Sequence, residues 1–190
     1  RTFLQLLSNI SIKKYSNIKT HLANSAGILI DNNFHFDMVR VGLCMYGYKP
    51  SQYQMNLNLK PVMSLKSKVS FIRIIDNEVG VSYGRNFITS KKTKLAVISI
   101  GYADGIYRTL SNKISLLHNG KMYPQIGAIT MDQLMIDVTG ANDINVGDTV
   151  ILLGCDEGKC ISPVDWAHAA STIPWEILCA FKNRLPRVQI

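Results

Sequence analysis

Six short motifs contain the histidine, arginine, tyrosine and aspartate side chains that could take part in proton transfer or anion binding. They are, in chain order, His21-Leu22-Ala23-Asn24-Ser25-Ala26, Val39-Arg40-Val41-Gly42, Val81-Ser82-Tyr83-Gly84, Gly101-Tyr102-Ala103-Asp104-Gly105, Met131-Asp132-Gln133 and Arg184-Leu185-Pro186-Arg187. A phenol has a reference pKa of about 10, so a tyrosine needs a perturbed environment or a cationic neighbour to act as a base near neutrality. An arginine is essentially never deprotonated, so it donates hydrogen bonds but gives up no proton.

The residue types alone favour structural roles for these side chains. A tyrosine in an apolar β segment, such as Tyr83, is usually a packing residue with one satisfied hydroxyl. A lone arginine such as Arg40 is more often a salt-bridge partner, and His21 fits a buried histidine bonded to backbone. Ser25 could cap a following helix, and Gly42 could end a strand. Without further information these alternatives stay open.

The four cysteines, Cys44, Cys155, Cys160 and Cys179, could pair with one another or bind a metal. The close pair has a C-x4-C spacing, and no matching C-x2-C or H-x3-H partner follows it. We therefore expect free thiols and no metal site. Because the sequence shows no secretory signal, we expect a reducing, cytoplasmic location.

The composition is that of a globular protein, with 47% hydrophobic and 18% charged residues in a chain of 190. The net charge of +8 could suit nucleic acid, an acidic membrane or a phosphorylated ligand. However, the lysines are scattered, and aromatic residues do not alternate with the basic ones as a base-stacking surface requires. No apolar run is long enough to cross a bilayer. We expect neither a nucleic-acid partner nor a membrane partner.

The first fifty residues have the pattern of an α/β unit. Apolar residues in 2–14 predict a helix, and the segments 18–25 and 39–47 predict strands. After Pro50 the pattern changes to short β-rich runs separated by turn signals, which predicts a compact β barrel or sandwich. These runs are 63–75, 94–100, 113–118, 135–138 and 149–153.

Two helices are predicted near the end of the chain. Ser162 followed by Asp165 forms a capping-box pattern with proline at the first helical position, which predicts a helix over 163–170. A second helix is predicted over 174–181. The boundary between the α/β part and the β part should fall within the polar stretch 52–59.

Taken in this order, the six motifs resemble the alanine racemase family, and the resemblance runs from about Ile18 to the C-terminal end. It implies a mainly β fold. Residues 1–55 would form the last strands and a helix of a pyridoxal-phosphate-binding (β/α)8 barrel, and residues 56–190 a C-terminal β-barrel-like domain with a few short helices. The family's cofactor-holding lysine and its early barrel strands are absent from these residues.

The resemblance also implies a set of residues for the cofactor, pyridoxal 5′-phosphate. Arg40 matches the family arginine that donates to the pyridine nitrogen, and His21 matches a histidine that orients this arginine. Ser25, Gly42 and Leu43 match positions that bind the phosphate through a hydroxyl and backbone N–H groups. Because arginine keeps the pyridine nitrogen unprotonated, side reactions such as transamination should be suppressed.

A second set of residues is implied for the substrate. Tyr83 matches the base that serves the L-alanine face, Met131 matches a backbone N–H that holds the substrate carboxylate, and Tyr102 matches a tyrosine that limits substrate size. Asn24 and Asp132 fall in supporting positions. Two residues depart from the family pattern, Ala128 where an arginine often lines the access channel and Asn183 where some members have a tyrosine near the phosphate.

The implied function is the interconversion of L-alanine and D-alanine, which supplies D-alanine for cell-wall peptidoglycan. The implied enzyme is a homodimer in which the β domain of one subunit completes the barrel site of the other. This chain alone should be inactive, because the cofactor lysine is missing from it. The alternative is a catalytically silent dimerisation or binding domain derived from an alanine racemase.

Overall fold

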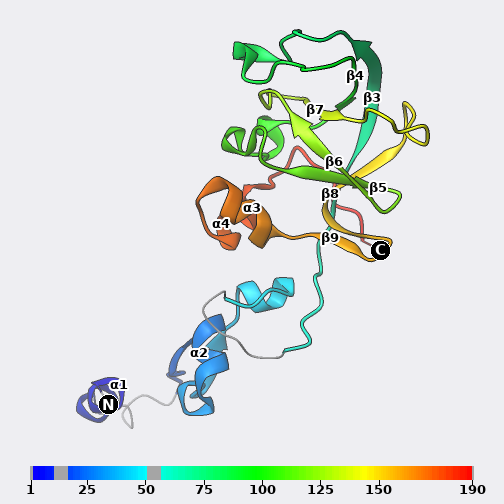
Figure 1. Ribbon diagram of the computed structural model, residues 1–190. Coiled ribbons are helices and arrows are strands. Elements are labelled where there is room, and N and C mark those ends of the chain that lie inside the picture. The colour runs from blue at the N-terminus through cyan, green and yellow to red at the C-terminus, as the bar shows by residue number, and fades with distance from the viewer. Residues whose placement is uncertain (1, 11–16, 51–56, 190) are drawn as a thin grey trace. The chain divides into compact units, whose positions relative to one another are not determined.

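The computed structural model describes residues 2–10, 17–50 and 57–189 (Figure 1). The chain divides into two compact units, Arg1–Val62 and Met63–Ile190. The domain boundary predicted between residues 55 and 56, and most of the stretch 52–59, lie outside the described residues. No helix among the described residues is long and apolar enough to span a bilayer.

The first unit contains two short parallel strands, each followed by a helical segment. Strand β1 (His21–Asn24) leads into helix α2 (Ser25–Ile30) and the 3-10 turn η2 (Asn32–Phe34). Strand β2 (Met38–Arg40) leads into the 3-10 turn η3 (Leu43–Tyr46). The strands pair with His21 beside Met38 and Asn24 beside Arg40. Helix α1 (Thr2–Asn9) precedes them.

These elements are shorter than the sequence predicts. The predicted helix 2–14 ends at Asn9, and residues 11–14 lie outside the described part of the chain. The predicted strand 39–47 ends at Arg40, because Gly42 and the left-handed Gly47 (φ +85°) bracket a 3-10 turn. An alternation of apolar residues was therefore not sufficient evidence for a strand there.

The second unit is a closed β barrel, which confirms the predicted mainly β fold. Its strands are β3 (Leu65–Ile75), β4 (Thr93–Ile98), β5 (Ser115–His118), β6 (Lys121–Ile126), β7 (Leu134–Asp137), β8 (Thr149–Asp156) and β9 (Lys159–Ile161). The order is β3-β4-β7-β6-β5-β8-β9, and β3 also pairs with β8. Strand β3 bends near Val69, so that residues before it pair with β8 and residues after it pair with β4.

The interior of this barrel is one continuous apolar core. Its most fully buried side chains include Ile98, Leu116, Leu134 and Ile136. Helices α3 (Pro163–Ala170) and α4 (Pro174–Ala180) lie side by side and add Trp166 to the same core (Figure 1). The bounds of α3 agree with the prediction, and the Ser162–Asp165 capping box is present.

The prediction missed two strands, β6 and β9, and both follow a tight hairpin turn. Asn119 and Gly120 both have positive φ, as do Glu157 and Gly158. Each pair is the two-residue loop of a hairpin, with His118 opposite Lys121 and Asp156 opposite Lys159. The turn signals were recognised in the sequence, but the returning strand after each turn was not.

The expectation of four free thiols is wrong for two of them, because Cys155 and Cys160 form a disulfide. The hairpin explains this pairing. A two-residue turn at Glu157-Gly158 places Cys155 directly opposite Cys160, with their Cα atoms 4.0 Å apart. A C-x4-C spacing around such a turn is therefore a cross-strand pair. Cys44 and Cys179 are free thiols.

Candidate active site

Arg40 and His21 lie on the neighbouring strands β2 and β1, and their side chains are in contact. Arg40 Nη1 donates to His21 Nδ1. Because a guanidinium can only donate, this contact assigns the proton of a neutral His21 ring to Nε2. The Arg40 side chain is exposed, so its other N–H groups can reach a ligand. The predicted His21–Arg40 contact is present, and the role of Arg40 toward a cofactor stays a prediction.

Ser25 joins the end of β1 to the loop that follows β2. Its buried Oγ accepts hydrogen bonds from the N–H of Gly42 at 2.9 Å and of Cys44 at 3.4 Å. Asn24 caps α2, since its Oδ1 accepts from Ala26 N at 3.1 Å and from Gly27 N at 3.0 Å. The reading of Ser25 as the cap is wrong, because Asn24 fills that position.

The backbone at Gly42 and Leu43 borders Ser25, and the Leu43 N–H is available there. A Cβ at Gly42 would lie 3.8 Å from Ser25 Oγ, which shows that the glycine borders the hydroxyl. Within the described ranges of the chain, the Leu43 N–H has no hydrogen-bond acceptor. One hydroxyl and neighbouring backbone N–H groups thus meet at one place, and this donor set suits a phosphate.

Tyr83 projects from a loop that is anchored at the two residues before it. Ser82 has a φ of +64°, and its Oγ donates to the Ala128 carbonyl at 2.7 Å. Val81 is buried and packs against Gly127, where an added Cβ would meet Val81 O at 2.6 Å. Tyr83 is nevertheless 74% exposed. The reading of Tyr83 as a packing residue is therefore wrong.

Tyr102 and Met131 lie on two turns that are bonded directly to each other. The Tyr102 N–H donates to Thr130 O at 2.9 Å, and the Ala103 N–H donates to Met131 O at 3.0 Å. Gly101 permits this approach, because a Cβ there would lie 2.3 Å from Thr130 O. The segment 128–131 therefore contacts both the Tyr83 loop and the Tyr102 turn, which brings the three predicted substrate residues to one region.

Tyr102 and Met131 are 43% and 52% exposed, so neither is the core residue that its type alone suggests. In the part of the chain that the structure describes, the Met131 N–H has no hydrogen-bond acceptor. An unpaired amide can bind a carboxylate oxygen. The geometry is compatible with the predicted role of Met131, and that role stays a prediction.

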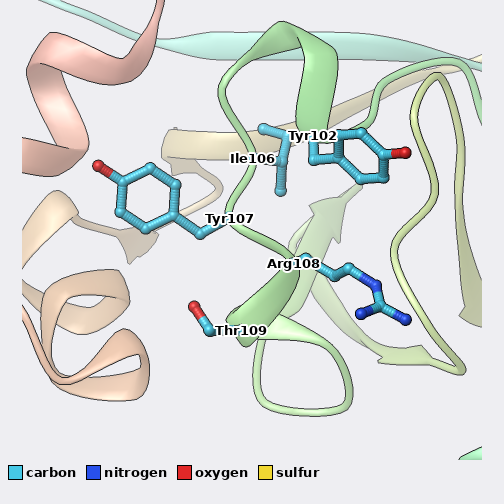
Figure 2. A pocket seen from close by; sticks show the side chains of 5 residues that line it. All are labelled: Tyr102, Ile106, Tyr107, Arg108 and Thr109. Carbon is cyan, nitrogen blue, oxygen red and sulfur yellow. The ribbon is translucent and has the colours of Figure 1, made fainter.

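A pocket extends from Tyr102 along the chain to Thr109 (Figure 2). Figure 2 shows the Tyr102 ring and the Arg108 guanidinium on one side of this segment and the Tyr107 ring on the other. The Tyr107 hydroxyl donates to Glu176 O at 3.1 Å, and burial raises its pKa, helped by the charges of Glu176 and Cys179. Tyr107 is therefore held as a neutral phenol with a structural bond.

Two arginines near the site had no role assigned from sequence. Arg108 lies beside the recognised Gly101–Gly105 motif, and its proximity to Tyr102 could have been inferred from that position. Arg184 belongs to a recognised motif, but its bonds reach Asp104 and Asp132, far away in the sequence. Among the described residues, no group of three or more histidine, cysteine, aspartate or glutamate side chains could hold a metal ion.

The predicted residues are distributed over both units. His21, Asn24, Ser25, Arg40, Gly42 and Leu43 belong to the first unit. Tyr83, Tyr102, Met131 and Asp132 belong to the second. Of the two departures from the family pattern, Ala128 is buried and Asn183 is exposed.

Comparison with protein families gives two matches in chain order. The profile described as "Alanine racemase, N-terminal domain" matches residues 1–50, and "Alanine racemase, C-terminal domain" matches residues 62–189. An alanine racemase of Prochlorococcus marinus is 51% identical over 189 residues, which are 99% of this chain and 49% of that protein. One from Nostoc is 47% identical and covers 100% of this chain and 50% of its own length.

Solved structures agree with the sequence matches. An alanine racemase from Streptomyces lavendulae superposes with a TM-score of 0.89 at 36% identity, over 98% of this chain and 49% of that one. The Bacillus anthracis enzyme with bound L-Ala-P gives a TM-score of 0.86 at 34% identity, over 95% and 47%. The chain spans about half the length of these relatives. The resemblance seen in the six motifs is thus confirmed, and the chain belongs to the alanine racemase family.

Proposed function

We propose that the protein containing this chain interconverts L-alanine and D-alanine with pyridoxal 5′-phosphate as cofactor. The observation that carries this proposal is the exposed Tyr83 on an anchored loop, next to the segment that bears the unpaired Met131 amide. Relatives support the choice of cofactor, since a Bartonella henselae alanine racemase of TM-score 0.82 has covalently bound pyridoxal phosphate. When bound, the cofactor supplies an electron sink that makes the α-proton of an amino acid acidic.

The residues of the first unit fit this cofactor. Ser25 Oγ and the Leu43 N–H would hold the phosphate, and the Gly42 N–H, which donates to Ser25 Oγ in this structure, would turn to the phosphate when it is bound. Arg40, in contact with His21, would donate to the pyridine nitrogen. Because arginine cannot give up its proton, it leaves that nitrogen unprotonated. This favours simple α-proton transfer over transamination.

Tyr83 would take the α-proton from L-alanine at its phenolic oxygen and return it in the reverse direction. A racemase needs two acid/base groups on opposite faces of the α-carbon, or one group that reaches both. By resemblance, the second group is the cofactor lysine, which these residues do not include. The positive φ of Ser82 and the left-handed Gly84 (φ +74°) turn the backbone so that Tyr83 points outward.

Met131 and Tyr102 would set the position and the size of the substrate. The Met131 N–H would hold the alanine carboxylate, and this donor has a fixed direction because Thr130 O, which belongs to the same planar peptide group, accepts from the Tyr102 N–H. Tyr102 lines the pocket, and its ring would limit the substrate side chain to a small group (Figure 2). Asn24 and Asp132 would support the two halves of the site.

The exposure of Tyr83 also supports a proposed assembly. A base that serves the barrel of a neighbouring subunit must stand clear of its own core, as Tyr83 does. We infer a homodimer in which each β barrel completes the site of its partner. Cytoplasmic location and supply of D-alanine for peptidoglycan follow from the family as further proposals.

Exchange of the α-proton tests the function. Full-length protein containing this chain, loaded with pyridoxal 5′-phosphate, should racemise alanine and exchange the α-proton with deuterium oxide. Tyr83→Phe should lower exchange from L-alanine by about 100-fold or more, as expected for loss of a general base, while exchange from D-alanine falls less. NMR of each alanine enantiomer measures both rates.

Tyr123→Phe is the matched control, because Tyr123 is buried in the barrel core and is not among the proposed site residues. It should leave both exchange rates near those of the unmodified protein. Equal loss of exchange from both enantiomers in Tyr83→Phe would contradict a two-base mechanism. A folded, cofactor-loaded protein without exchange or racemisation would favour the catalytically silent binding domain.

A further inference from the structure

Arg184 bridges two carboxylates that belong to separate turns. Its Nε lies 3.0 Å from Asp104 Oδ1, and its Nη2 donates to Asp132 Oδ1 at 2.6 Å. The Asp104 side chain is largely buried, whereas those of Arg184 and Asp132 are about half exposed. A guanidinium presents several donors in a rigid plane, so one arginine can fix two carboxylates at a set separation.

Each of these aspartates is part of a turn that carries a proposed substrate residue. Asp104 Oδ2 accepts from Gly101 N at 3.0 Å, which closes the turn around Tyr102. Asp132 directly follows Met131. Two backbone hydrogen bonds, from Tyr102 and Ala103, already join these turns, and Arg184 adds a side-chain connection between them. This connection helps to fix the position and the direction of the Met131 N–H.

Charge gives Arg184 a second effect. Asp132 is adjacent to the amide that is proposed to hold the substrate carboxylate, and a free carboxylate there would repel the substrate. The hydrogen bond from Arg184 neutralises Asp132 at this point. The pKa of Arg184 is raised above its usual value, first by the bond to Asp132 and next by the charge of Asp104, so the cation persists.

We propose that Arg184 is a positioning residue, which sets affinity for the substrate carboxylate by holding the Met131 amide and by cancelling the charge of Asp132. This inference rests on the proposed function, because it needs Met131 to bind that carboxylate. The inference goes beyond the proposed function because it assigns a positioning role to Arg184.

Substitution of Arg184 in the full-length, cofactor-loaded protein tests this proposal. Arg184→Gln should raise the KM for alanine about tenfold and change kcat less than about threefold, as expected when ground-state and transition-state binding weaken together. Arg184→Lys should recover part of the loss, since an ammonium keeps the charge but not the fork. Arg187→Gln is the control, because Arg187 Nη2 donates to Phe181 O and to neither aspartate.

The double variant Arg184→Gln/Asp132→Asn separates charge from structure. Removing the uncompensated carboxylate should bring KM back to within about threefold of the unmodified value if repulsion is the main cause. A double variant no better than Arg184→Gln, or an Arg187→Gln variant with the same rise in KM, would overturn the proposal. An equal fall in kcat and kcat/KM without a change in KM would do so as well.

A binding measurement on the 190-residue chain keeps this test independent of racemase activity. Propionate, a carboxylate without an amino group, should shift the Met131 amide signal in NMR spectra, and Arg184→Gln should weaken its binding about tenfold if one charge interaction is lost. An inactive full-length protein would refute the proposed function alone. Unchanged propionate binding in Arg184→Gln, or no shift at Met131, would refute the inference.

Discussion

The two units of this chain bury their apolar residues to different extents. In the second unit the strands close into a barrel around a continuous core. In the first unit β1 and β2 form a two-stranded parallel sheet with exposed side chains such as Leu22 and Met38. Parallel sheets are normally covered on both faces. The first unit thus has the surface of an element that packs against further structure, which supports its proposed place in a (β/α)8 barrel.

This difference extends to the candidate site. Tyr83, Tyr102 and Met131 are held by backbone bonds, close glycine contacts and an arginine bridge within one barrel. Ser25 and Arg40 depend on a few contacts between two short strands and the loop after them. We conclude that the proposed substrate side of the site is held firmly within this chain, whereas the proposed cofactor side needs support from other elements to become rigid.

The largest expected effect comes from Gly101, which permits the closest approach in the second unit. In Gly101→Ala the new Cβ would lie 2.3 Å from Thr130 O and 2.4 Å from Met131 O, and backbone atoms cannot easily move aside. We expect a loss of about 3 kcal/mol in the free energy of unfolding. Urea denaturation measures this change.

Gly140→Ala is the control for that substitution, since an added Cβ there meets no atom within 4 Å although φ is +80°. Its cost should be about 1 kcal/mol, from the left-handed backbone alone. If both variants lose the same stability, the Gly101 turn is less firmly docked than the barrel around it. The contrast between a rigid substrate side and a weakly supported cofactor side would then be wrong.

Local signals predicted much of the second unit. The capping box at Ser162 defined α3, and most strands were found from their apolar runs. The two missed strands have weak apolar patterns, and they become visible only when Asn119-Gly120 and Glu157-Gly158 are read as hairpin turns. In the first unit, the apolar residues of the 3-10 turn after Arg40 were assigned to a strand. A segment forms a strand only where another strand pairs with it, and that pairing is not encoded in the local sequence.

The site was predicted from motifs, and the residue types alone gave the wrong environment for Tyr83, Tyr102 and Met131. Each is an apolar or aromatic residue that would ordinarily be buried, and each is exposed because a turn directs it outward. The Arg184 bridge could not be predicted, since it joins residues 52 positions apart in the chain. Only the folded barrel brings Asp104, Asp132 and Arg184 together.

A smaller effect is expected from the disulfide of the β8–β9 hairpin. Cys155→Ser should lower the free energy of unfolding of the second unit by less than about 2 kcal/mol, because a disulfide that closes a short loop removes little entropy from the unfolded chain. The two-residue turn and the pairing of Gly154 with Ile161 already hold the hairpin. Cys179→Ser, at an exposed free thiol, is the control and should have no effect. A loss well above this bound would show that the barrel depends on the covalent bond.

The smallest effect concerns the first unit, where Asp37 holds the start of β2 against the residue before β1. Asp37 Oδ2 accepts from Thr20 N at 2.9 Å and from Thr20 Oγ1 at 2.6 Å, and these bonds lower the pKa of Asp37 below its usual 3.8. A lowered carboxyl pKa stabilises the fold above the pKa of the unfolded chain, and this contribution is lost as the pH falls through the folded value. Acid below about pH 3.8 should therefore loosen β1 and β2.

The carboxyl ¹³C signal of Asp37 measures the titration, and Thr20→Val should raise its midpoint because the largest cause, the hydroxyl bond, is removed. An unchanged midpoint in Thr20→Val would mean that this contact does not hold the two strands together, and the first unit would then depend on outside support even more than we infer.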